Sequence, residues 1–101
     1  MGHRQKMSKI LHDVLGSNNV YFQPPPSLKM SFPCIVYEMS GIGTTFADNE
    51  PYHLDHIYRV IYIDYDPDSG IPDKIAMLPH CISERPYKSD NKYYHAFRIT
   101  I

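Results

Sequence analysis

The segment 56–65, which reads HIYRVIYIDY, constrains the fold of this chain more than any other part of its sequence. Nearly all of its residues are β-branched or aromatic, which is typical of a β-strand. Because apolar side chains fall on both faces, the segment predicts a central strand, covered on one side by helices and on the other by a neighbour or a partner. A chain of 101 residues has room for one domain, so we expect residues 1–101 to fold around this strand.

The other regular elements follow from hydrophobic spacing and from turn residues. An amphipathic helix over 4–15 is predicted by apolar residues at Met7, Ile10, Leu11, Val14 and Leu15. Gly16 follows as its C-terminal stop. A second, shorter helix is expected over 71–78, because Pro72 and Asp73 suit a first helical turn and Pro79 suits an end. Further strands are predicted over 20–22, 33–39, 81–85 and 93–101.

The segment 41–53 has no sustained hydrophobic period. It contains Gly41, Gly43 and Pro51, and it is either a mobile loop or a hairpin arm. Its length makes it a candidate functional loop, because long irregular segments in compact domains usually carry function. The predicted order is therefore α-β-β-(loop)-β-α-β-β. This order favours an α+β fold: a mostly antiparallel β-sheet with two helices packed on one face.

The charge of the chain is nearly balanced, with ten Lys and Arg against eleven Asp and Glu and a net charge of −1. This balance argues against a nucleic-acid binder, and the one basic concentration, Arg4, Lys6 and Lys9, is too small for a binding patch. The longest apolar runs, such as 60–63, are too short to cross a bilayer or to form a signal peptide. We therefore expect no membrane segment and no specific nucleic-acid partner.

Three aspartates, Asp64, Asp66 and Asp68, have the spacing of the first ligands of a calcium-binding loop. The rest of that pattern fails, because the glycine comes one position late, at Gly70, and the twelfth position holds Ile75 instead of a glutamate. The aspartates are better explained as a solvated turn that precedes a helix.

Histidines and cysteines offer a second candidate chemistry. A zinc site could combine His53, His56, His80 and Cys81, but no Cys-x-x-Cys pair supports it. A cysteine nucleophile could use Cys34 or Cys81 with His80 or His95 as base, yet no local motif marks either thiol. We expect no enzyme activity, no metal and no cofactor; a small metal-binding domain or enzyme remains the alternative from another class.

Several short blocks occur in an order that resembles the tail terminator, or tail completion, proteins of long-tailed, siphovirus-like bacteriophages. The blocks cover roughly residues 10–99 and are QPP at 23–25, FPCIVYE at 32–38, FADN at 46–49, PY at 51–52, DPDS at 66–69, IPD at 71–73, LP at 78–79 and DN at 90–91. The resemblance implies a non-enzymatic α+β structural protein that forms a ring, a hexamer in this family.

Such a ring caps the head-proximal end of the tail tube, ends its polymerisation and joins the tail to the head. The implied partners are further copies of the chain, the tail tube protein and the head–tail connector proteins. DNA would pass through the ring without being recognised. The implied location is the virion, with assembly in the host cytoplasm. A head-completion or connector adaptor protein is the alternative within the same class.

A closed ring needs a heterologous interface, and aromatic side chains are enriched where proteins meet. The chain contains nine tyrosines, and the segment 41–53 is long enough to reach a neighbour. We therefore predict interface residues in that segment, in the strand that follows it and in the last strand: Phe46, Asp48, Asn49, Tyr52, Tyr58, Tyr62, Tyr93 and Tyr94.

Overall fold

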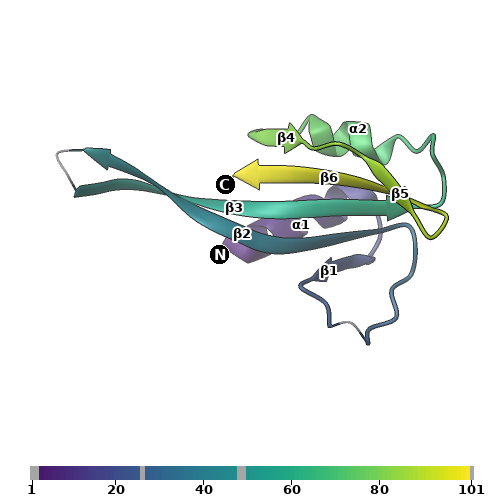
Figure 1. Cartoon of the computed structure of the whole chain (residues 1–101). Coiled ribbons are helices and arrows are strands. Elements are labelled where there is room, and N and C mark those ends of the chain that lie inside the picture. Colours follow the sequence, from purple (N-terminus) through teal and green to yellow (C-terminus); the bar gives the residue numbers. More distant parts are fainter. Residues whose placement is uncertain (1–2, 26, 48–49, 101) are drawn as a thin grey trace.

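The computed structural model of the chain is an α+β fold with six strands and two helices (Figure 1). It describes the backbone of residues 3–25, 27–47 and 50–100, and the side chains of 4–25, 27–41 and 56–100. In chain order the elements are α1 (His3–Leu15), β1 (Val20–Phe22), β2 (Cys34–Ala47), β3 (Glu50–Asp64), α2 (Ile71–Ala76), β4 (Cys81–Ser83), β5 (Tyr87–Ser89) and β6 (Lys92–Thr100).

The strands form one sheet in the order β1-β2-β3-β6-β4, and β5 also pairs with β6. All pairs are antiparallel except β1 with β2, which run parallel. The predicted class, a mostly antiparallel sheet with two helices, is confirmed. The predicted central strand is also confirmed, because β3 lies between β2 and β6.

The structure corrects the predicted elements in two places. The segment 41–53 is not an irregular loop, because β2 continues to Ala47 and β3 begins at Glu50. The alternative interpretation, a hairpin arm, is the one that the backbone adopts. In addition, the strand β5 was not predicted; it pairs with β6 across the turn at Asp90 and Asn91.

One face of the sheet carries the hydrophobic core. Alternate residues of β3, namely Tyr58, Val60 and Tyr62, point toward this face and are buried, as the period of a strand requires. Helix α1 contacts β1 and β2, helix α2 contacts β4 and β6, and the two helices contact each other. Their buried residues join the strand residues in one cluster: Met7, Leu11, Ile35, Tyr37, Tyr58, Val60, Tyr62, Ile75, Phe97 and Ile99. Each such side chain contributes roughly 1.5–3 kcal/mol of burial energy.

The opposite face of the sheet is more polar and more open. Ile57, Arg59 and Ile61 of β3 are half-buried there. Arg59 lies directly opposite Arg98 of β6, and its Nε is 3.7 Å from Glu84 Oε1. Burial on both faces was the basis for predicting a central strand, and the structure shows that the two faces are buried to different degrees.

Candidate functional site

The most distinctive feature of the fold is a two-stranded projection, here called the hairpin arm, which comprises residues 41–47 and 50–56. Strands β2 and β3 pair from Cys34 with Ile63 out to Ala47 with Glu50. Strand β6 pairs with β3 only as far as Ile57, and β1 pairs with β2 only over residues 35–37 of β2. Within the described residues, therefore, no third strand pairs with the arm. Figure 1 shows the arm continuing well past the end of β6, and the molecule measures 51 Å along its longest axis against 25 and 23 Å across.

Irregular pairing marks the base and the outer part of the arm. The register of β2 against β3 shifts between Met39 and Gly41 and again between Thr45 and Phe46. Such bulges increase the local twist of a strand pair and bend it, and the ribbon in Figure 1 twists along the arm. The arm therefore leaves the sheet as a twisted ribbon whose outer edges are available to another chain.

Two of the four interface residues predicted in the segment 41–53 lie in the arm. Phe46 belongs to β2 and Tyr52 to β3, so the backbone places both in the arm. Asp48 and Asn49 lie outside the described residues. The arm thus contains the two members of this part of the predicted interface that the structure describes.

Two predicted interface residues are in the wrong place for an interface. Tyr58 is 0% exposed and Tyr62 is 1% exposed, and both rings lie in the core under the helices. The reason is the period of the strand, since positions 58, 60 and 62 share the face that packs against α1 and α2. Tyr58 and Tyr62 are therefore core residues of the single chain.

The last two predicted interface residues, Tyr93 and Tyr94, lie at the start of β6 and are half-buried. The ring of Tyr94 stacks on that of Tyr87, with centroids 4.9 Å apart and an interplanar angle of 8°. Tyr93 lies on the other face, where Lys88 Nζ is 5.5 Å from its ring centroid. The arm projects from the Ile57 end of β3, whereas Tyr93 pairs with Asp64 at the other end. The structure therefore does not bring these two tyrosines together with the arm.

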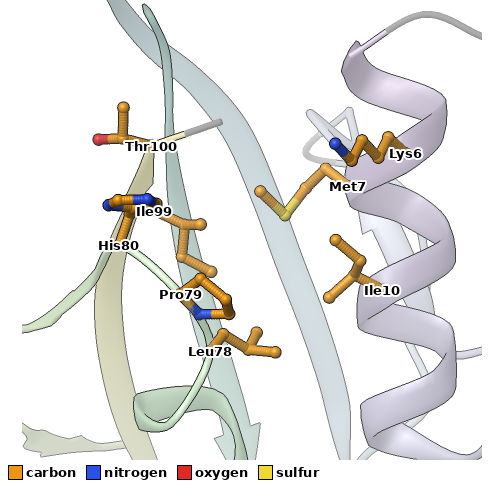
Figure 2. A pocket seen from close by; sticks show the side chains of 8 residues that line it. All are labelled: Lys6, Met7, Ile10, Leu78, Pro79, His80, Ile99 and Thr100. Carbon is orange, nitrogen blue, oxygen red and sulfur yellow. The ribbon is translucent and has the colours of Figure 1, made fainter.

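A pocket of about 220 Å³ was not predicted (Figure 2). Its walls come from three segments: Lys6, Met7 and Ile10 of α1, the stretch Leu78-Pro79-His80, and Ile99 with Thr100 at the end of β6. The sequence signal for this pocket is weak, because each segment supplies only two or three residues. The sequence also did not predict which apolar side chains are exposed. Met77 is 86% exposed and Ile82 is 65% exposed.

The aspartates considered for calcium use their oxygens within the turn. Asp64 Oδ1 accepts a hydrogen bond from the N–H of Asp66, and Asp66 Oδ1 accepts one from the N–H of Asp68. These are the local bonds by which aspartate stabilises turns. In the part of the chain that the structure describes, no group of three or more His, Cys, Asp or Glu side chains is placed to hold a metal ion.

Both thiols are held in the protonated form. Burial, with a smaller effect from the charge of Asp64, raises the pKa of Cys34 to about 11. Burial also raises the pKa of Cys81. A nucleophilic cysteine needs the opposite shift, because the thiolate is the reactive species.

Comparison of the chain with protein-family models, with curated proteins and with solved structures finds no significant match. Among the described residues, neither helix has the length and apolar character needed to cross a membrane.

Proposed function

We propose that this chain is a non-enzymatic structural protein of a long-tailed bacteriophage that forms a ring at the head-proximal end of the tail tube. In this role the ring ends polymerisation of the tube and offers a surface to the head connector proteins. The resemblance of the sequence blocks over residues 10–99 supports the proposal. The structural observation that carries it is the hairpin arm.

The arm supports self-assembly for an energetic reason. A two-stranded hairpin without further packing is marginally stable in water, and its unpaired edges are templates for pairing with another chain. Within the described part of the molecule, no third strand pairs with residues 41–47 and 50–56, so both edges of this hairpin lack a strand partner. A neighbouring copy that packs on the arm would supply the missing contacts, and repetition of that heterologous contact around an axis closes a ring.

The first test is the mass of the chain in solution, measured by light scattering over a wide concentration range. A hexamer of chains of 11.8 kDa has a mass of about 71 kDa. The matched variant replaces residues 43–55 by Asn-Gly, which closes a short hairpin directly beyond the pair Ile42 and His56. This arm-shortened variant should keep its circular dichroism spectrum and its cooperative unfolding while losing self-association.

The second test is made in the phage. Deleting the gene should give tails of abnormal length that are not joined to heads, as seen by negative-stain electron microscopy. The wild-type chain supplied in trans should restore normal particles, and the arm-shortened variant should not. Tails of normal length without heads would indicate a head-completion adaptor instead, and unchanged particles would contradict both roles.

A further inference from the structure

The apolar pocket lies beside the base of the hairpin arm. Ile99 and Thr100 line the pocket, and they pair with Tyr58 and Ile57 of β3, where the arm begins. In Figure 2 the side chains of Ile10, Met7 and Ile99 point into the space between α1 and β6. A cavity of about 150 Å³ can hold a benzene ring, so this pocket, at about 220 Å³, is large enough for one aromatic or large aliphatic side chain.

The pocket has apolar walls and a basic rim. Met7, Ile10, Leu78, Pro79 and Ile99 form the walls, whereas the two side chains that carry or can take up positive charge are Lys6 and His80. None of the described residues that line it is acidic. Lys6 is exposed and forms no ion pair in the described part of the chain. A ligand with apolar and acidic groups therefore matches the pocket.

The arm has that complementary composition. By sequence, residues 42–55 include Asp48, Glu50 and Asp55 but no lysine or arginine, and they include Phe46 and Leu54. The helix that forms one wall of the pocket has the opposite balance, with Arg4, Lys6 and Lys9 against Asp13. Charge complementarity of this kind steers association and favours one register over others.

We infer that the pocket between α1, the Leu78–His80 stretch and the end of β6 receives the hairpin arm of a second copy of this chain. The arm of the same copy is directed away from the pocket, because β2 and β3 continue outward in one paired ribbon beyond Ile57 (Figure 1). Each copy would then give its arm to one neighbour and accept an arm from the other, which is a heterologous contact. This inference rests on the proposed assembly function and names the surface that the arm contacts.

Charge reversal across the contact tests the inference. Lys6→Glu should weaken self-association at least about fivefold, because it places a negative charge opposite an acidic arm. Combining Lys6→Glu with Glu50→Lys and Asp55→Lys should restore most of the loss. Lys29→Glu is the matched control, since Lys29 is also exposed but does not line the pocket, and it should change self-association by less than about twofold.

Photocrosslinking identifies which residues of two associated chains are in contact, whereas the charge-reversal variants report how tightly the chains associate. A benzoylphenylalanine at position 10, in a mixture of ¹⁵N-labelled and unlabelled chains, should yield products of mixed isotope composition. These products should join position 10 to residues within 42–55. Crosslinks only within one chain, or between chains but to another segment, would overturn the inference.

The outcomes separate the inference from the proposed function. If shortening the arm abolishes assembly while Lys6→Glu has no effect and the crosslinks fall elsewhere, the arm mediates assembly but this pocket is not its site. If the chain stays monomeric at every concentration, the inference is overturned. The proposed function is then judged separately by the tail lengths of phage that lack the gene.

Discussion

The hydroxyl of Tyr62 donates a hydrogen bond to Asp64 Oδ2, with the two oxygens 2.5 Å apart. The same hydroxyl lies 3.0 Å from Ser69 Oγ, which in turn accepts a hydrogen bond from the N–H of Ile71. These contacts connect the buried central strand to the first residue of α2. Burial and the hydrogen bond with Asp64 raise the pKa of Tyr62 to about 12, so the donor stays protonated at neutral pH.

Tyr62→Phe should therefore lower the free energy of unfolding by about 1–2 kcal/mol, because a hydrogen bond to a charged acceptor is lost. Tyr58→Phe is the matched control, since the Tyr58 hydroxyl is buried and has no hydrogen-bond partner in the described structure. Removing that hydroxyl should leave stability unchanged or raise it. Urea denaturation at pH 7 measures both variants, and equal losses would contradict the assignment of these two roles.

Gly16→Ala should destabilise the fold by about 1 kcal/mol. Gly16 directly follows α1 with φ at +76°, and its N–H donates a hydrogen bond to the carbonyl of His12 at 2.8 Å. A Cβ at this position meets no atom within 4 Å, so the cost is one of backbone conformation alone. Gly41→Ala meets no atom within 4 Å either and lacks a positive φ, so thermal denaturation should show no loss for it.

Asn91→Gly should raise the free energy of unfolding by about 0.5–1 kcal/mol, and Asn91→Val should lower it by about 1 kcal/mol or more. Asp90 and Asn91 form the two-residue connection between β5 and β6, with φ values of 51° and 63°. Both angles are positive, as a type I′ turn requires, and glycine adopts this conformation without steric cost. The melting temperature should be highest for Asn91→Gly, intermediate for the wild type and lowest for Asn91→Val. A highest melting temperature for Asn91→Val would exclude a type I′ turn at these positions.

Stability should fall when the pH rises above 9. The thiol of Cys34 has a folded pKa of about 11 against an ordinary value of 9.0, so the unfolded chain loses this proton first. The contribution of this thiol to the free energy of unfolding is complete below pH 9. It declines by up to about 1.4 kcal/mol per pH unit between pH 9 and pH 11. Comparing urea denaturation at pH 8 and pH 10 tests this. Cys34→Ala should show a fall that is smaller by about 1 kcal/mol, and an identical fall would contradict the role of this thiol.

The parts of the fold that the sequence predicted are those with a strong local pattern. The stripe of apolar residues on α1 specifies a helix with one buried face, and the β-branched run of β3 specifies a strand in the middle of the sheet. The sequence of the arm did not distinguish a loop from a hairpin, because Gly41, Gly43 and Pro51 interrupt any hydrophobic period. The two strands of the arm are defined only by their pairing with each other. Strand β5 has only three residues after Pro86, too few to show alternation.

The candidate site was less predictable for two physical reasons. The central strand is apolar on both faces, so its sequence does not show which of its tyrosines face the helices. In the structure, Tyr58 and Tyr62 are the ones that face them. The pocket combines residues near positions 6–10, 78–80 and 99–100, and such a combination exists only once the helix has packed against the sheet.

An arm made of two paired strands can change in length only in particular steps. Removing one residue from each strand beyond Gly41 and Ile57 preserves the pairing but exchanges the two faces of everything farther out. Removing two from each strand keeps the faces and shortens the reach by about 7 Å. Variants of this chain whose arm differs in length should therefore gain or lose two residues at a time in each strand of the arm, while the sheet stays the same.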